Sequence, residues 1–452
     1  MTRRPIWIRN DRSMAWITRY VSTIVETRTP RWWWVAFAFT SLLAVGGIFG
    51  FSYLVSTGVG VWGDNIPVAW GWGITNFVFW IGIAHAGTLI SAILLLCRQP
   101  WRTSINRAAE AMTLFAVVCA GIYPVLHLGR AWMVWYMVPI PNSFGLWPNF
   151  RSPLMWDAFA VGTYLTVSVL FWYTGLIPDL ATLRDRARHG LRRYLFGFFA
   201  LGWCGSGTQW ACYRKAYILL AGICTALVIS VHSIVACDFA ATILGGWHST
   251  IFPPYFVVGA IFGGCAMVLT LLIPLRALYP PLHDLITQHH LQSLSRIVLF
   301  TGSLLGFVYT LEFFLAWLSG NAHEQFLIGQ RTWAGPIRTA FWAMIICNIL
   351  VPQLFWWRKV CSLPWLVWVI AQFPNVGMWL ERFVIIPGSL VRDRLPSSWG
   401  HFQPTWVDIL CFSGTIGLFL SLFLLFVRWI PLICMHELKT QIAARTQLRT
   451  EN

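Results

Sequence analysis

Apolar residues form long runs along the chain, and short stretches rich in Pro, Gly and Trp separate these runs. A run of about 20 apolar residues is long enough to cross a bilayer as an α-helix. The pattern therefore predicts an all-α polytopic membrane protein with about ten transmembrane helices. The predicted spans are 32–56, 70–97, 109–138, 155–177, 214–245, 253–278, 295–319, 335–357, 362–387 and 405–434. A shorter apolar segment, 192–203, is expected to lie at the membrane interface.

The connections between spans are short, so the sequence predicts no soluble domain of useful size. We expect a basic N-terminal segment (1–31), a single transmembrane domain (32–434) and a C-terminal tail (435–452). Composition agrees, because 57% of the residues are hydrophobic and only 11% are charged, against about a quarter in soluble domains. The N-terminal segment has no short apolar core that leads to a small-residue cleavage site, so we expect the first span to be retained.

The formal net charge of +16 comes from 32 Lys and Arg against 16 Asp and Glu. Most of the basic residues lie in alternate connections between spans. The exceptions are Arg130, Arg151, Arg331, Arg338, Arg382, Arg392 and Arg394. Because Lys and Arg mark cytoplasmic loops, we expect a multi-pass protein of the bacterial inner membrane with both termini in the cytoplasm. The same distribution favours contact with the lipid bilayer and argues against nucleic acid as a partner.

The 11 Cys are scattered, mostly within apolar runs, and no Cys-x-x-Cys pair occurs. Iron–sulfur clusters and structural zinc need grouped ligands, so we expect neither of them in this chain. The histidines of the spans are isolated from one another, whereas a bis-histidine haem in a helix bundle needs histidines on facing helices. We therefore expect no intrinsic haem and no metal site.

Four polar residues of three consecutive spans are predicted to lie at one depth, near the external side. His127 lies late in the third span, and Arg130 follows three residues later, which would place both on one helix face. Asp157 lies in the first turn of the fourth span, and Asp238 lies about two turns inside the external end of the fifth. Ionisable groups inside a membrane are costly and often mark a functional pathway, so the pattern predicts a site here.

Each of these residues also has a structural explanation. Asp157 could compensate the helix dipole as an N-terminal acid, and Arg130 could be an interface anchor paired with it. His127 could donate a hydrogen bond to a backbone carbonyl. Asp238 fits a purely structural role least well, because a carboxylate at its depth needs a partner.

Three further ionisable residues lie deeper or toward the cytoplasm. His85 and His232 are midway along the second and fifth spans, and Glu110 lies where the third span begins, beside Arg107. One hypothesis is a proton path from Glu110 through His85 and His232 to Asp238. The structural alternatives are two packed histidines and an interfacial Glu110–Arg107 ion pair.

Three segments carry a resemblance to a known family. They are WIGIAHAGTLISAI (80–93), RTSINRAAEAMT (102–113) and IYPVLHLGRAW (122–132). These segments resemble the NrfD/PsrC family, whose membrane subunits exchange electrons with quinones, and within it the ActC-type subunit of alternative complex III, a quinol-oxidising assembly. The resemblance implies two four-helix bundles, spans two to five and six to nine, with the first and last spans at the periphery.

The resemblance also implies a function. In that family the quinol site uses a His near the end of the third helix and an Asp on each of the next two, positions held here by His127, Asp157 and Asp238, with Arg130 in support. Menaquinol or ubiquinol would be the substrate. The implied partners are an external iron–sulfur subunit, c-type haem subunits, a paralogous ActF-type membrane subunit and small membrane subunits. The family is also proposed to translocate protons.

Two other functions fit the same residues. A paralogous ActF-type subunit would conduct protons or act as a scaffold without a quinol site. A secondary transporter would use His and Asp near the midplane to bind a coupling ion, and its membrane helices would be broken near that site.

Overall fold

The fold is seen in a computed structural model that describes residues 13–188, 190–393 and 395–450. Within these ranges the chain is helical and contains no strand, as predicted. Nine segments of the described chain are long and apolar enough to cross a membrane. They are α2 (Arg31–Thr57), α3 (Trp72–Leu96), α4 (Asn106–His127), α5 (Pro153–Arg186), α7 (Gly207–Ala240), α8 (Phe252–Leu278), α10 (Gln288–Leu318), Arg338–Trp356 and α15 (Trp406–Trp429).

The remaining predicted span corresponds to α14 (Pro364–Leu390), a helix of 27 residues that is less apolar than the others. Its sequence includes Asn375, Glu381 and Arg382, and all three side chains are buried. Polar groups that face the inside of a bundle lower the average hydropathy of a helix without exposing charge to lipid. Helix α14 packs against α8 and against α12 (Arg338–Ile345), so it belongs to the same layer of helices.

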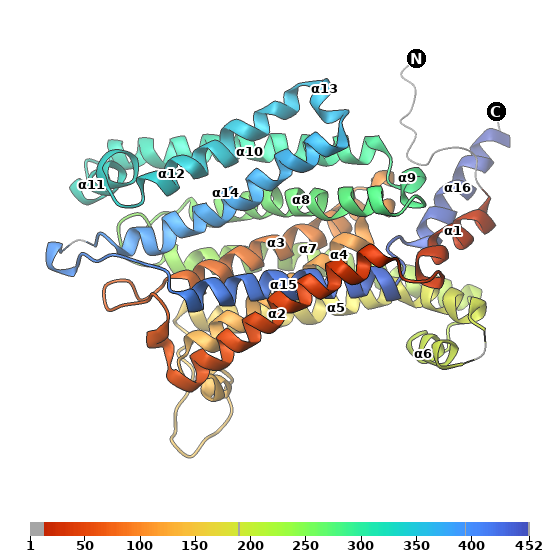
Figure 1. Cartoon of the computed structure of the whole chain (residues 1–452), viewed down its shortest axis with the longest axis horizontal. Coiled ribbons are helices and arrows are strands. Elements are labelled where there is room, and N and C mark those ends of the chain that lie inside the picture. The colour runs from red at the N-terminus through yellow and green to blue at the C-terminus, as the bar shows by residue number, and fades with distance from the viewer. Residues whose placement is uncertain (1–12, 189, 394, 451–452) are drawn as a thin grey trace.

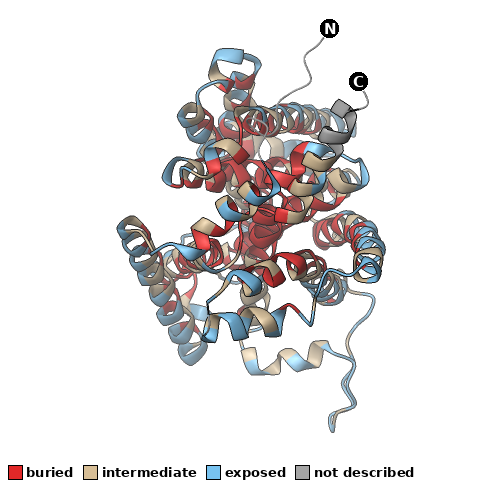
Figure 2. Ribbon diagram, turned by 90° about the vertical axis from the view of Figure 1, so that its right-hand side faces the viewer, coloured by how far each residue is buried: buried red, intermediate tan, exposed pale blue. Residues whose placement is uncertain are grey.

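Two groups of four helices form the core. Helices α3, α4, α5 and α7 pack together, and so do α8, α10, α14 and the segment Arg338–Trp356. The groups meet where α3 and α7 pack on α8 and where α3 packs on α14. Figure 2 shows buried residues at the centre of the molecule and exposed ones around its periphery. The predicted two-bundle architecture is confirmed.

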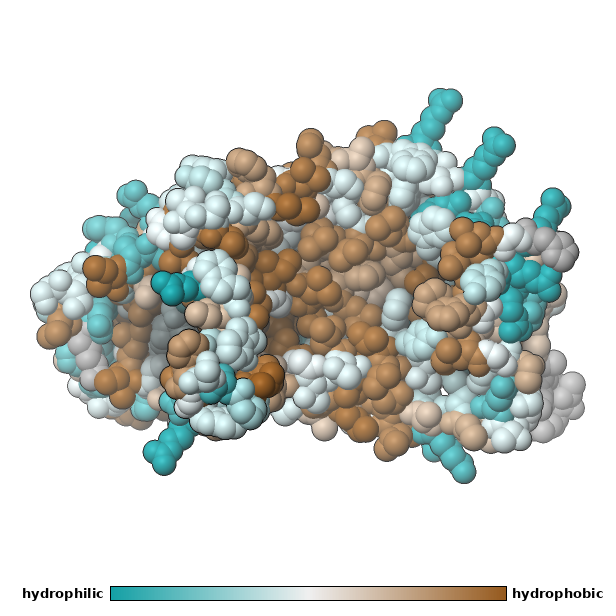
Figure 3. Space-filling model, turned by 90° about the horizontal axis from the view of Figure 1, so that it is seen from below, coloured by the Kyte–Doolittle hydropathy of each residue, from teal (hydrophilic) through white to brown (hydrophobic). Residues whose placement is uncertain are grey.

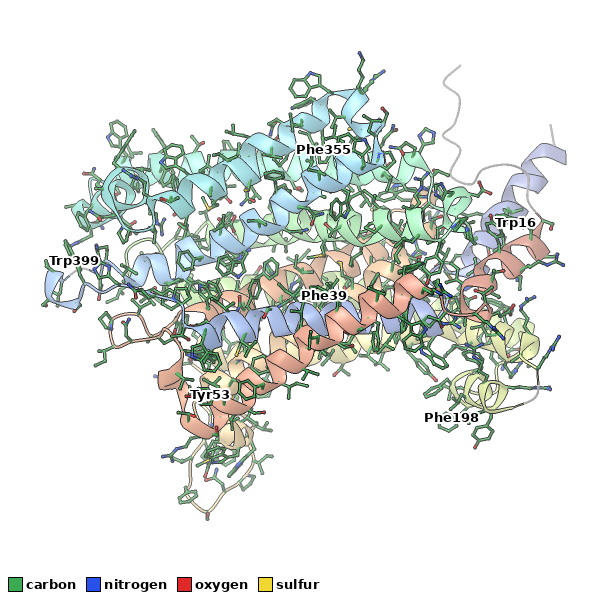
Figure 4. All side chains as sticks on the ribbon, viewed as in Figure 1. Trp16, Phe39, Tyr53, Phe198, Phe355 and Trp399 are labelled. Atoms are coloured by element: carbon green, nitrogen blue, oxygen red, sulfur yellow. The ribbon has the colours of Figure 1, made fainter. Side chains whose placement is uncertain are left out.

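Helices α2 and α15 pack against each other on the outside of the first bundle. Their backbones approach closely at two glycines, because a Cβ atom on Gly47 would lie 2.5 Å from the Cα of Gly414. Small residues permit such contacts between membrane helices. The opposite side of α2 carries exposed apolar residues such as Phe39, labelled in Figure 4. The first and last spans are peripheral, as predicted.

The surface is apolar around the middle of the molecule and more polar toward its two ends (Figure 3). Helices α1 (Met14–Glu26), α6 (Leu191–Phe199) and α16 (Met435–Thr450) gather at one end (Figure 1). Trp16 and Phe198 mark this end in Figure 4, and Trp399 marks the other. Helix α6 occupies the predicted interfacial segment.

Helix α1 packs against α16, so both ends of the described chain lie at the same end of the bundle. These two helices account for the described parts of the predicted N-terminal segment and C-terminal tail; residues 1–12 and 451–452 lie outside the described residues. Which end faces the cytoplasm is inferred from the basic residues and stays a prediction.

Helix α4 is shorter than the predicted span, because it ends at His127. Gly129 has a φ of +75°, the left-handed conformation that often follows a helix end and that glycine adopts without steric cost. The chain continues as a 3-10 helix, η3 (Ala131–Met137). The prediction that Arg130 shares a helix face with His127 is therefore wrong, since Arg130 lies beyond the helix.

Helix α7 also ends before its predicted limit, at Ala240. Gly246, in the turn that follows, has a φ of +76°. Asp238 therefore lies in the last turn of α7 rather than two turns inside it. Helix α5 begins at Pro153, so Asp157 lies near its start. The two acids thus occupy facing ends of neighbouring helices.

Candidate functional site

Asp157 and Asp238 form a pair of carboxyl groups between α5 and α7. Only 7% of each residue is exposed, and their side chains interact through a hydrogen bond. A hydrogen bond between two carboxyl groups needs a proton on one of them, because an ionised carboxylate can only accept. The pair is therefore suited to hold and release one proton as a unit.

One oxygen of each carboxyl group is left without a partner. Oδ1 of Asp157 and Oδ1 of Asp238 are buried and accept no hydrogen bond from any described residue. Buried polar atoms in folded proteins are nearly always bonded, so such atoms call for a ligand or water. The pair can accept hydrogen bonds from the hydroxyl group of a bound molecule.

His127 is the last residue of α4 and lies one turn after Pro124. Its ring stacks on Trp62, with 6.5 Å between ring centroids and 24° between planes. Trp62 follows η1 (Val59–Val61) in the connection between α2 and α3, and it packs in an apolar cluster with Leu126. Within the described chain, neither ring nitrogen of His127 makes a hydrogen bond, so both are free to meet a ligand.

The structure places the three predicted quinol-site residues at one end of the first bundle, on helices that pack in sequence. Helix α4 packs on α5 and α5 packs on α7, and His127, Asp157 and Asp238 lie at the adjoining ends. The two acids meet each other. No hydrogen bond or ion pair between described residues joins them to His127, so His127 and the acid pair are two separate elements at the same end.

Arg130 is exposed and lies in the connection after α4. Among the described residues it forms no ion pair, so the predicted anchor pairing with Asp157 is not seen. Its guanidinium group is available at the rim of the site rather than inside it.

A second polar arrangement lies in the centre of the first bundle. The Nδ1 atoms of His85 on α3 and His232 on α7 are 3.1 Å apart, and His85 Nδ1 is 2.6 Å from the carbonyl oxygen of Ile81. The short contact to a carbonyl, which can only accept, assigns the proton to Nδ1 of His85. The Nε2 atoms of both rings are buried and have no partner among the described residues.

Hydroxyl groups extend this arrangement along α3 toward Glu110. The ring of Tyr164 stacks on His85 with centroids 4.8 Å apart, and its hydroxyl lies 2.9 Å from Thr88 Oγ1. One turn further along α3, Ser91 donates a hydrogen bond to Glu110. The histidines and Glu110 were predicted from sequence, whereas the hydroxyl residues between them were missed. Their three-residue spacing on one helix face was the available signal.

Glu110 does not pair with Arg107, contrary to the structural alternative. Arg107 instead forms a buried ion pair with Asp179 of α5 and donates a hydrogen bond of 2.7 Å to the carbonyl oxygen of Gly175. The pairing follows from helix geometry, because Arg107 and Glu110 lie close along α4 but point at different neighbours. Glu110 is left to Ser91 and to Tyr217, whose hydroxyl is 3.4 Å away.

At its other end the histidine pair faces the second bundle. His232 lies within electrostatic range of Arg382 on α14, and both pack on the ring of Phe256; the Arg382 guanidinium lies 4.0 Å from that ring's centroid. Arg382 is ion-paired to Glu381 at 2.6 Å. No hydrogen bond among the described residues links His232 to Asp238, so the last step of the predicted path stays a prediction.

Comparison with known proteins identifies the family of this helical architecture. A family model described as "Polysulphide reductase, NrfD" matches residues 60–392. A curated relative from Halobacterium salinarum, named as a "Putative dimethyl sulfoxide reductase" membrane protein, is 24% identical over 235 residues. The alignment covers 52% of this chain and 49% of the relative. The chain thus matches about half of the length of that relative.

Proposed function

Because the chain belongs to the NrfD polysulphide reductase family of membrane subunits, we propose that it oxidises quinol as a subunit of an electron-transfer complex of the alternative complex III type. Quinol binds near the external end of the first bundle, and an iron–sulfur partner subunit on that side receives the electrons. The unpartnered carboxyl oxygens of Asp157 and Asp238 are the observation that carries this proposal.

The chemistry matches these groups. Quinol becomes quinone by losing two electrons and two protons, so the site needs two proton acceptors. His127, with free ring nitrogens, takes the proton of one hydroxyl as general base. The acid pair accepts a hydrogen bond from the second hydroxyl through a free Oδ1 atom and takes up that proton. The electrons leave to the partner's cluster, since this chain is not expected to hold an electron carrier of its own.

Proton translocation is a second part of the proposal. The path begins at Glu110 and follows Ser91, Thr88 and Tyr164 to His85 and His232. The hydrogen bonds along α3 support the first half, and the contact between the two histidines supports the second. Hydroxyl and imidazole groups can each donate and accept, which is the property that proton relay requires.

The name of the Halobacterium relative supports a second candidate. The same quinol chemistry would then feed a terminal reductase through its iron–sulfur subunit, without c-type haem. The two candidates share the site and differ in their partners. The visible spectrum of the purified complex separates them, because c-type haem absorbs strongly and only the first candidate contains it.

The site is tested by quinol oxidation in the purified complex. His127→Ala and Asp157→Asn are each expected to lower kcat/KM by about 100-fold, the range of lost general-base catalysis. Arg151→Gln is the control, since Arg151 is exposed in the connection just before α5. Wild-type rates in both site variants would exclude the site and favour a subunit without quinol chemistry.

A further inference from the structure

An open cavity of about 750 Å³ lies at the end of the bundle opposite His127. The end of α3, the 3-10 helix η2 (Pro100–Ser104), the first turns of α7, and helix α16 form its walls, and Met14 of α1 lies at its edge. Its size falls within the range of small-molecule sites, about 300 to 1,000 Å³. The proposed quinol chemistry makes no use of this space.

The cavity has an excess of positive charge. Arg98, Arg102, Arg214 and Lys439 line it, and Glu437 is the acid among them. Arg102 is ion-paired to Glu437, with 2.6 Å between Nη2 and Oε1. The other three cations have no acidic partner within the described chain. Three unpaired cations around one space are suited to an anion with several oxygen acceptors.

Arg98 is held in an uncommon backbone conformation. It follows the C-cap residue Cys97 of α3 and has a φ of +51°. Helices usually place glycine at such a position, and another residue there costs about 1 kcal/mol. The arginine brings a charged side chain to the cavity where the backbone alone would favour glycine.

The other lining residues form an apolar wall, defined here as Leu95, Trp210, Tyr213 and Ile218. Ile218 is 56% exposed and lies on the outward side of α7, so the wall continues onto the membrane-facing surface. Trp and Tyr are typical of the level at which lipid head groups meet acyl chains. The cavity thus joins a cationic region to an apolar surface.

We propose that this cavity binds an anionic phospholipid. The phosphate group lies among Arg98, Arg214 and Lys439, and the acyl chains lie along the apolar wall. Free phosphate would satisfy the cations but leave the wall uncovered. A zwitterionic lipid would bring its own cation close to the three unpaired ones. The proposal is independent of the quinol site.

Native mass spectrometry of the delipidated full-length chain in detergent tests this proposal, with phosphatidylglycerol, phosphatidylcholine and inorganic phosphate as probes. We expect phosphatidylglycerol to bind at least about tenfold more tightly than phosphatidylcholine, a difference of about 1.4 kcal/mol. Arg98→Gln/Arg214→Gln is expected to remove that preference. The control Arg358→Gln/Lys359→Gln removes the same charge from α13 (Arg358–Cys361), where both residues are exposed, and is expected to keep it.

Three outcomes would overturn the proposal. They are equal binding of the two lipids, the same loss of binding in both double variants, and full displacement of phosphatidylglycerol by an equal concentration of phosphate. The last result would show a simple anion site in which the apolar wall has no part. Thermal unfolding of both double variants, measured alongside, shows that lost binding is not lost folding.

Discussion

His85 and His232 meet through Nδ1 atoms 3.1 Å apart, on two helices separated by 147 positions in the sequence. Both side chains are almost fully buried, with exposures of 1% and 0%. Because Nδ1 of His85 also contacts the Ile81 carbonyl, a proton can shift between ring and ring only if a tautomer changes. The pair is a defined point at which a proton path through the first bundle can be cut.

His85→Ala is expected to lower the number of protons moved per electron while leaving quinol binding unchanged. The substitution removes the ring that links Tyr164 to His232, and no other described side chain replaces it. Proton uptake and electron flow, measured together in proteoliposomes, give the ratio. His248→Ala provides the comparison, since His248 is exposed and bonds only a local carbonyl. An unchanged ratio in His85→Ala would remove this pair from the path.

Asp157 and Asp238 are expected to act as one unit in quinol oxidation. Asp157→Asn and Asp238→Asn should each lower kcat/KM by about 100-fold, and the double variant should lose little more than either. The coupling energy from this cycle should be about 1 to 3 kcal/mol, as for residues in direct contact. Steady-state kinetics of the four forms provide it. Losses that simply multiply would show that the acids act independently.

Arg107 and Asp179 form a buried ion pair whose loss is expected to destabilise the fold. Arg107→Ala leaves the Asp179 carboxylate in an apolar interior, at a cost of about 3 to 5 kcal/mol. Asp179 also accepts a hydrogen bond of 3.0 Å from the backbone N–H of Met435, so the start of α16 should loosen as well. Replacing both partners, as Arg107→Met/Asp179→Leu, should cost less than Arg107→Ala alone. Unfolding in detergent, followed by circular dichroism, compares the three forms.

Asp64 gives the connection between α2 and α3 a pH dependence. Burial, and then the neighbouring Asp408, raise the pKa of the Asp64 carboxyl from 3.8 to about 7. The folded chain therefore keeps a proton that the unfolded chain has already lost. This contribution to stability is complete below about pH 4, falls as the pH rises, and is gone above about pH 7.

Asp64→Asn stays neutral at every pH, so its melting temperature should exceed that of the wild type more at pH 8 than at pH 5. Asp185→Asn is the control, because the side chain of Asp185 is 66% exposed and its replacement should have the same small effect at both values. Differential scanning fluorimetry in detergent provides the measurement. An equal gain for Asp64→Asn at both pH values would contradict the assignment.

The helices were predictable from sequence because a bilayer demands long apolar segments, and that demand is local in the chain. The helix ends were less predictable. Gly129 and Gly246 stop α4 and α7 inside apolar runs, and hydropathy alone does not register a change of φ. Helix α14 was predicted despite its polar residues, and their burial explains why it still belongs to the bundle.

The side-chain pairings depend on how each helix is rotated about its axis, which one sequence does not reveal. Proximity along the chain made Arg107 the natural structural partner of Glu110, yet Arg107 points at Asp179 instead. Depth along the membrane, by contrast, follows from topology and sequence position. This is why Asp157 and Asp238 were grouped correctly at one end before their contact was known.

Gly47 and Gly414 bring α2 and α15 into backbone contact, and a larger side chain at either position is expected to separate them. A Cβ on Gly414 would lie 2.2 Å from the Cα of Gly47, so Gly414→Leu cannot be accommodated without moving a helix. We expect the variant to unfold at a temperature several degrees lower. Ser413→Leu, at the neighbouring, half-buried position, is the comparison. Equal melting of the two variants would show that close approach is unimportant there.

The pairing of α2 with α15 has a consequence for biogenesis. The first span to enter the membrane packs chiefly against the last, so it stays without its main protein neighbour until nearly the whole chain has been synthesised. During that interval lipid, or an insertion factor, must cover the glycine face of α2. A ribosome stalled before residue 406 would release a chain whose second bundle is complete while its first helix still has no place to dock.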